Sequence, residues 1–110
     1  MASEAFARIR AQVLELTARV PYGRVTTFNA IGAHMEVVPR HVAFLLVKLS
    51  EEEKLLLPWY RVVAEGGLVP SAKTEQRQLL AAEGAKFGQA RIVDCGRRFV
   101  AMGALVQKRR

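Results

Sequence analysis

Few side chains in this sequence could act as nucleophiles, bases or metal ligands. Cys95 is the single cysteine, and His34 and His41 are the only histidines. A lone cysteine forms no intramolecular disulfide, so a reducing compartment is the default expectation. The three residues form no cluster with zinc-ligand spacing. We therefore expect neither a metal site nor a cofactor.

The stretch LLLPWYRVV, residues 55–63, places two large aromatic side chains directly after a proline. The apolar run 55–57 is typical of a buried strand, and Pro58 should end it because proline withholds a backbone donor. Trp59 and Tyr60 are then expected on the turn that follows. There they serve either as a flat binding platform or as packing.

The composition indicates one globular domain with a basic surface. A chain of 110 residues, 51% hydrophobic and 25% charged, is typical of a single folded domain. Lys and Arg total 17 against 10 for Asp and Glu, and the net charge of +7 favours polyanionic partners. DNA-binding, ribosomal and membrane-surface proteins share this balance, so charge alone does not identify the partner.

The N-terminal region predicts a helix and no targeting segment. Apolar residues recur at helical spacing over 4–20, with Ser3 available as an N-cap and Pro21 as a stop. Charges interrupt this region too often for a signal peptide, and no apolar run approaches the roughly 18 residues of a membrane span. We expect a soluble, cytoplasmic protein.

The next segment predicts two short helices joined by a tight turn. After the turn sequence PYG, Thr26 or Thr27 can cap a helix that runs through His34. A second helix should begin near Pro39, a residue favoured in the first helical turn, and run through Leu49. Together they suggest a helix-turn-helix.

The second half is predicted to hold one further helix among turns. Residues 50–54, SEEEK, are expected to be a solvated acidic loop or a helix end, and EGGL at 65–68 a tight turn between two extended pieces. Strong helix formers over 73–83, followed by Gly84, predict a helix with a glycine C-cap.

The C-terminal part carries a weaker pattern. From residue 86 on, a hairpin with Gly96 in its turn is the expected structure. We predict one domain over 1–103 and a basic tail over 104–110.

Three blocks occur in order, VPYGRVTTFNAI, PRHVAFLL and LPWYRVVAEGGLV, followed by a helix ending LLAAEG. This order resembles the DNA-binding domain of the alkylguanine-DNA alkyltransferases, over about residues 5–85. That family carries PYG-x-V-[ST]-aromatic, a recognition helix with an arginine, a P-C-H-R-V active-site segment and a helix ending L-E-G. The resemblance implies a mainly α fold with a small β-hairpin and a winged helix-turn-helix used in the minor groove.

The departures from the family pattern are informative. Trp59 stands where the acceptor cysteine would be, and Tyr60 replaces the histidine, so thiolate and imidazole are both missing. This is the pattern of the alkyltransferase-like proteins, which bind guanine alkylated at the 6-oxygen without accepting the alkyl group. The resemblance implies a protein that is no enzyme, flips the damaged base and flags it for nucleotide excision repair.

The same resemblance also implies which partners the protein binds. They would be double-stranded DNA with alkylated guanine and excision-repair proteins, with no membrane involved. We expect a cytoplasmic monomer, nucleoid-associated when bound to DNA.

Five residues are expected to contact DNA, and three of them match positions that the family uses there. Arg40 matches the arginine that enters the base stack and fills the gap left by the extruded nucleotide. Phe28 matches a tyrosine that crowds the phosphate, although packing in the core is nearly as good an explanation. Ala43 matches a small residue that lets the backbone approach DNA, and Pro39 and His41 lie on the same run.

The expected lesion pocket is formed by Trp59, Tyr60, Arg61, Val62, Val63 and Gly67. Within this set a structural role for Arg61 is as plausible as a DNA contact. Glu83 matches the carboxylate of the family's hydrogen-bond relay, of which only a hydrogen bond between Tyr60 and Glu83 could survive.

Two alternatives remain open on the sequence. One is a transcription regulator whose helix-turn-helix recognises an undamaged sequence. The other is an alkyltransferase that uses Cys95 or Tyr60, although a phenol with a pKa of about 10 is a poor nucleophile at neutral pH.

Overall fold

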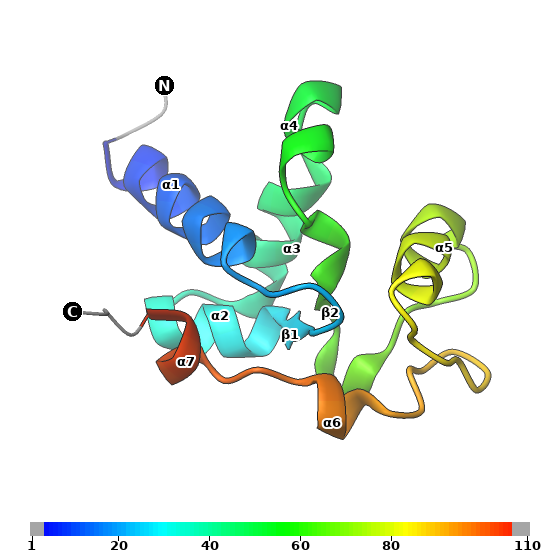
Figure 1. Cartoon of the computed structure of the whole chain (residues 1–110). Helices are drawn as coiled ribbons and strands as arrows, with labels where there is room; N and C mark the ends of the chain where they lie inside the picture. The colour runs from blue at the N-terminus through cyan, green and yellow to red at the C-terminus, as the bar shows by residue number, and fades with distance from the viewer. Residues whose placement is uncertain (1–3, 107–110) are drawn as a thin grey trace.

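The structure is a computed structural model that describes residues 4–106, built mainly from short helices around a two-stranded sheet. Figure 1 shows α1, α2 and α7 on one side of the molecule and α5 on the other, with β1 and β2 between them. The described elements are, in order, α1 (Glu4–Ala18), β1 (Thr26–Thr27), α2 (Phe28–Met35), α3 (Pro39–Val47), α4 (Glu51–Leu56), the 3-10 helix η1 (Trp59–Arg61), β2 (Val62–Val63), the 3-10 helix η2 (Glu65–Gly67), α5 (Thr74–Ala82), α6 (Cys95–Arg98) and α7 (Met102–Val106).

The predicted N-terminal helix is confirmed as α1. Its apolar face buries Val13 and Leu16, and the Thr17 hydroxyl donates to the Val13 carbonyl at 2.8 Å. The helix ends at Ala18, ahead of Pro21. Ser3, expected as its N-cap, lies outside the described residues.

The predicted helix-turn-helix is confirmed as α2 and α3. The Thr27 hydroxyl caps α2 by accepting from the Ala30 amide at 2.9 Å, and Pro39 occupies the first turn of α3. The chain bends by 113° between the two helices, within the usual range of this motif. The turn packs tightly because Gly32 has no side chain: a Cβ there would lie 2.6 Å from the Val37 carbonyl oxygen.

No single described helix is long and apolar enough to cross a membrane. Helices α2 and α3 together have the length and apolar composition of a membrane span, but the chain is bent by 113° between them.

The small sheet differs from the expected hairpin. Strands β1 and β2 pair in parallel, with Thr26 opposite Val62 and Thr27 opposite Val63. The turn predicted at 65–68 is present as η2, but it closes only one antiparallel bridge, between Ala64 and Leu68. A parallel pair needs a long crossover, and α2, α3 and α4 provide it.

The segment before Pro58 is a helix, so the prediction of a buried strand over 55–57 was wrong. Ser50 and Glu53 form a capping box that starts α4, with hydrogen bonds of 3.1 and 2.9 Å between side chains and backbone amides. Leu55 and Leu56 lie within this helix and are 87% and 82% exposed. Pro58 and the aromatic pair follow on a turn, as predicted, in the form of η1.

The predicted helix over 73–83 is confirmed as α5, and Gly84 follows it with a φ of +97°. The hairpin expected around Gly96 was wrong, because Gly96 lies inside α6, and the bridges described nearby join Phe87 to Ile92, Arg91 to Leu68 and Phe99 to Val25. Helix α7 spans the expected boundary between 103 and 104, and its Leu105 is buried. Residues 107–110 of the expected tail lie outside the described residues.

The described apolar side chains pack into two clusters that meet at β2. One lies among α1, α2, α3 and α7 and includes Val62, and the other lies under α5 and includes Val63. Adjacent strand residues point to opposite faces. The two-residue strand therefore joins the two halves of the core.

Candidate functional site

A cavity of about 500 Å³ lies between α3, η1 and the start of α5. Its volume is within the usual range of small-molecule sites. Apolar side chains dominate its wall, and a few polar groups come from α4 and α5. The lining residues are Phe28, Ala43, Leu46, Val47, Lys54, Trp59, Val62, Ala64, Leu68, Pro70, Ala72, Lys73, Thr74, Glu75 and Gln76.

Trp59 is half-buried and forms part of the cavity wall. Its ring meets the ring of Tyr60 edge-on, with centroids 5.9 Å apart and planes at 88°. The Lys54 ammonium lies 5.1 Å from the centre of the indole. Trp59, Lys54 and Glu75 also line a neighbouring cavity of about 530 Å³. Trp59 thus borders both cavities.

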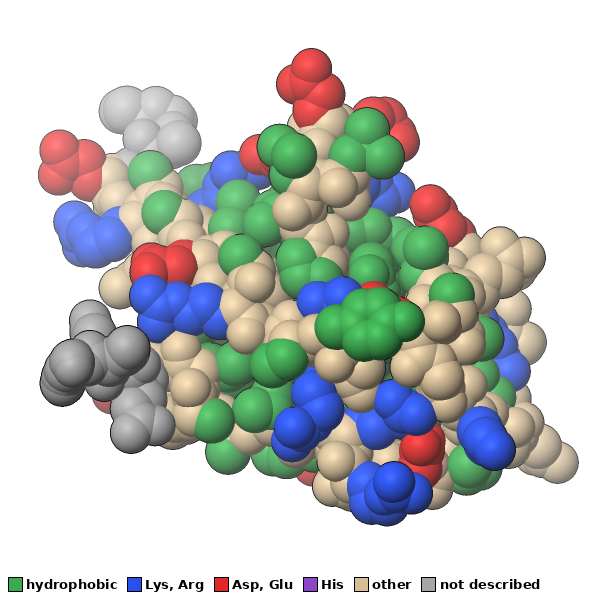
Figure 2. Space-filling model, in the orientation of Figure 1, with side chains coloured by type: hydrophobic (Ala, Val, Ile, Leu, Met, Phe, Trp, Pro, Cys, Tyr) green, Lys and Arg blue, Asp and Glu red, His purple; other side chains and the backbone are tan. Residues whose placement is uncertain are grey.

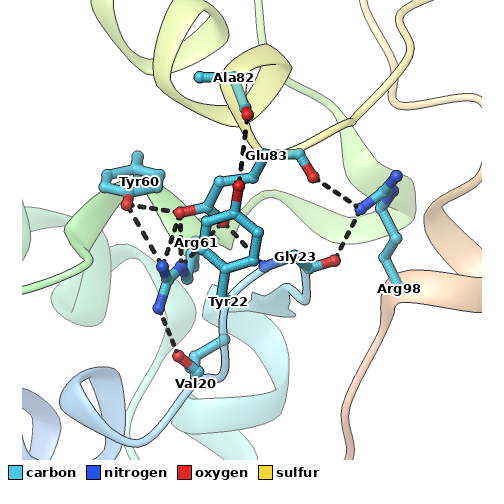
Figure 3. Close-up of polar contacts among 8 residues, drawn as sticks. All are labelled: Val20, Tyr22, Gly23, Tyr60, Arg61, Ala82, Glu83 and Arg98. Carbon is cyan, nitrogen blue, oxygen red and sulfur yellow. Dashed lines mark hydrogen bonds and ion pairs between the residues drawn. The ribbon is translucent and has the colours of Figure 1, made fainter.

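A buried ion pair holds the segment that carries Trp59. Arg61 donates to Glu83 at 2.6 to 3.2 Å through Nε and Nη2, and their side chains are only 13% and 7% exposed. Glu83 also accepts from the Gly23 amide at 2.9 Å and from the Tyr60 hydroxyl at 2.7 Å. Arg61 further donates to the Val20 carbonyl at 2.8 Å. Figure 3 shows the loop after α1, η1 and the end of α5 converging on this carboxylate.

The charges in this network are well defined. Burial alone would raise the pKa of Glu83, but hydrogen bonds from Arg61, the Gly23 amide and Tyr60 outweigh it, so its pKa lies below the ordinary value. Burial, and then the hydrogen bond to Glu83, raise the pKa of Tyr60 above its ordinary value. Tyr60 is therefore a neutral donor near pH 7. The predicted hydrogen bond between Tyr60 and Glu83 is confirmed.

Two residues that the sequence did not single out add hydrogen bonds here, Gln76 to the segment that carries Trp59 and Arg98 to the glycines beside Glu83. The Gln76 amide on α5 donates to the carbonyls of Tyr60 and Val62 at 3.1 Å, and Gln76 itself lines the cavity. Arg98 donates to the carbonyls of Gly23 and Gly84 at 2.7 Å. In the sequence, Gln76 and Arg98 are polar residues without a motif around them. Such residues are more often solvated than structural.

The structure brings together part of the expected lesion pocket. Trp59 and Val62 line the main cavity, whereas Tyr60 and Arg61 line the neighbouring one. Val63 does not line either cavity, because strand alternation turns it into the second core cluster. Gly67 is buried against Cys95, where a Cβ would lie 2.8 Å from the cysteine Cβ.

The expected DNA-binding residues divide in the same way. Phe28 and Ala43 line the cavity and thus lie in the same wall as Trp59. Arg40 is exposed near the start of α3 and has no hydrogen-bond or ion-pair partner within residues 4–106. His41 is half-buried and stacks on Phe6, with ring centroids 6.1 Å apart. Pro39 begins α3 against Gly32.

The cavity wall offers no sulfur or imidazole nucleophile. Neither Cys95 nor a histidine is among the described residues that line it. Cys95 is half-buried and packs against Gly67, and burial followed by the nearby charges of Asp94 and Glu65 raises the pKa of its thiol. Over residues 4–106 we find no group of three metal-ligating side chains.

These features define a small helix-turn-helix domain with an aromatic-walled cavity beside its second helix. The family model described as 6-O-methylguanine DNA methyltransferase, DNA binding domain, matches residues 8–85, so the chain belongs to this family. The resemblance predicted from the sequence is thereby confirmed. Comparison with curated proteins gave no match.

Solved structures support the same fold. The chain is similar to S. pombe Atl1 in complex with damaged DNA containing O6-carboxymethylguanine, with a TM-score of 0.75 and 20% identity over 91% of this chain and 98% of that one. It is also similar to S. pombe ATL in complex with DNA, with a TM-score of 0.73, 20% identity and the same coverage. The mainly helical architecture with a two-stranded sheet matches these structures.

Proposed function

We propose that this protein binds double-stranded DNA containing guanine alkylated at the 6-oxygen and flips the damaged base into the cavity beside Trp59. It does not accept the alkyl group, and it marks the lesion for nucleotide excision repair. We further propose that it acts as a cytoplasmic monomer that joins the nucleoid when bound to DNA. The observation that carries the proposal is an indole in the cavity wall, at the position where the family's acceptor cysteine would stand.

The chemistry of the cavity supports recognition of the lesion. Alkylation at the 6-oxygen removes the ring N–H donor of guanine and adds apolar bulk. A mostly apolar cavity of about 500 Å³ accepts that bulk. Unmodified guanine keeps its N–H, which would find few acceptors in such a cavity. The net charge of +7 supplies the attraction to phosphates that any DNA complex requires.

The helix-turn-helix supports the docking mode. Arg40 is exposed at the start of α3 without a partner in the described part of the chain, and its planar cation suits the gap left by a flipped base. Phe28 and Ala43 belong to the cavity wall itself. Phe28 supplies bulk, and Ala43 supplies room.

The absence of alkyl transfer follows from the reactive groups. The indole of Trp59 has no nucleophilic atom at neutral pH. Tyr60 holds its proton because its pKa is raised, and the phenol donates to Glu83. Cys95 packs against Gly67, does not line the cavity, and has a thiol whose pKa is raised by burial.

One experiment tests binding and transfer together. We expect a duplex with 6-O-methylguanine to bind roughly 10- to 100-fold tighter than the matched guanine duplex at one salt concentration, from burial of the methyl group and the cost of an unpaired N–H. Charge attraction to phosphate cancels in this ratio. With a radiolabelled alkyl group, we expect no label on the protein after denaturation. Equal affinities would reject the binding proposal, and covalent label would reject the absence of transfer.

The surface of α4 supports a protein partner. Leu55 and Leu56 are exposed, and Glu51 and Glu52 lie on the same helix. Figure 2 shows acidic and apolar side chains next to one another over α4, at the top of the view. The neighbouring cavity of about 530 Å³ continues this surface toward Trp59. A partner segment with apolar and basic side chains would complement it.

The partner surface is tested by a double substitution. We expect Leu55→Ser with Leu56→Ser to leave lesion affinity within about twofold, because neither leucine lines the main cavity. The same variant, bound to a lesion duplex, should bind purified damage-recognition proteins of excision repair at least roughly tenfold more weakly. A loss of this size is usual when an interface loses a buried apolar contact. Val93→Ser, an exposed apolar residue outside both cavities, is the control. Unchanged recruitment would exclude this surface.

A further inference from the structure

Lys54 holds an unusual position for a surface lysine. It belongs to the last turn of α4, lines the main cavity, and places its ammonium 5.1 Å from the centre of the Trp59 ring. It forms no ion pair with any residue in the described range 4–106. The face of an indole attracts a cation, so this contact holds the charge beside the cavity.

The other charges around the cavity leave this ammonium available. Lys73 and Glu75 also line the cavity, but both are exposed at the start of α5 and neither pairs with Lys54. Glu53, the acidic neighbour of Lys54, is occupied by Arg10 at 2.9 Å and by the Ser50 amide. Glu53 is therefore already paired and Glu75 is solvated. The Lys54 ammonium faces a mostly apolar cavity.

We propose that Lys54 makes the cavity selective for alkyl adducts that end in a carboxylate, such as a carboxymethyl group on the 6-oxygen of guanine. This inference rests on the function proposed above and specifies its lesion class. The alkyl group would lie against the indole, and the ammonium over that ring would donate a charge-assisted hydrogen bond to the carboxylate. Such bonds are stronger than those to a neutral amide, and an apolar setting strengthens them further.

The test compares two adducts of nearly equal shape. One duplex carries 6-O-carboxymethylguanine and the other 6-O-carbamoylmethylguanine, in which an amide replaces the carboxylate. We expect the protein to bind the carboxylate duplex about tenfold more tightly, the scale of one charge-assisted hydrogen bond. In Lys54→Met, which keeps the length of the side chain and removes the charge, the ratio should fall to about one. In Lys54→Arg most of the preference should remain.

Lys48→Met is the matched control. Lys48 also lies over an aromatic ring, 5.5 Å from the centre of Phe44, but it does not line the cavity. Its loss lowers the net charge by the same amount, so both duplexes should bind more weakly and their ratio should persist. Lys73→Met should likewise keep the ratio within about twofold, because that side chain has no fixed position over the indole.

Three outcomes would overturn the inference. They are a carboxylate-to-amide ratio of one or less in the unmodified protein, a ratio unchanged in folded Lys54→Met, and a ratio lost in Lys73→Met alone. Each is compatible with strong binding of 6-O-methylguanine. Failure of the inference is thus distinct from failure of the proposed function, which would appear as equal binding of 6-O-methylguanine and guanine.

Discussion

Replacing Trp59 by alanine is expected to lower the affinity for 6-O-alkylguanine duplexes by about 10- to 100-fold, with little change for unmodified duplexes. The indole is the large flat surface in the cavity wall, and stacking of a base on an aromatic side chain contributes roughly 1 to 3 kcal/mol. On the proposed function, unmodified DNA binds through charge and does not contact this wall. Fluorescence anisotropy with the two duplexes at one salt concentration measures both affinities.

Trp59→Phe is the matched control for this prediction. It keeps an aromatic face and most of the packing against the first core cluster, to which Trp59 contributes from a half-buried position. We expect it to retain most of the lesion preference. If Trp59→Ala folds and keeps the full preference, the indole is packing only, and the cavity beside it is not the lesion site.

Replacing Glu83 by alanine is expected to lower the free energy of unfolding by about 3 to 5 kcal/mol. The substitution leaves the Arg61 guanidinium, only 13% exposed, without its counter-charge, and removing one partner of a buried pair has this cost. The Gly23 amide and the Tyr60 hydroxyl lose their acceptor as well. For a domain of this size Tm should fall on the order of 15 °C, as measured by calorimetry.

Glu15→Ala provides the comparison. Glu15 pairs with Arg19 at 2.6 Å, but this pair is exposed, and such pairs contribute less than about 1 kcal/mol. A Glu83→Ala variant no less stable than Glu15→Ala would show that the buried network does not stabilise the fold.

The same carboxylate predicts how stability depends on pH. The pKa of Glu83 is lower in the folded protein than its ordinary value of 4.5. Its contribution is therefore complete above about pH 4.5 and is lost as the pH falls through the lower folded value. Chemical denaturation between pH 6 and 3 should show a fall in stability that is shallower in Glu83→Gln.

The sequence predicted the long periodic elements well and the short ones less well. Helices α1, α2 and α3 carry helical apolar spacing together with a cap or a proline, and α5 consists of strong helix formers followed by Gly84, so local signals agree with tertiary packing. For α4 the sequence allowed a helix end at 50–54 but predicted a strand at 55–57, because a short apolar run fits a buried strand equally well. The capping box of Ser50 and Glu53 was the signal that separates the two.

The site was only partly predictable for a similar reason. Phe28, Ala43 and Trp59 come from three segments and line one cavity, whereas the family pattern predicted only Trp59 in the pocket and the other two on DNA. Val63 was misplaced because its neighbour Val62 takes the cavity side of β2, and the alternation of so short a strand is not visible as a pattern. Lys54 and Gln76 were overlooked because polar residues on helices are usually solvated.

The arrangement of Val62 and Val63 also limits how this protein can vary. These neighbours anchor opposite halves of the interior, and Pro58 and η1 lie directly ahead of them. Inserting or deleting one amino acid between Pro58 and Val62 would exchange the faces of the two valines. It would also turn the indole of Trp59 away from the cavity. Side chains in this segment can therefore change over evolution more readily than the number of residues between the proline and the strand.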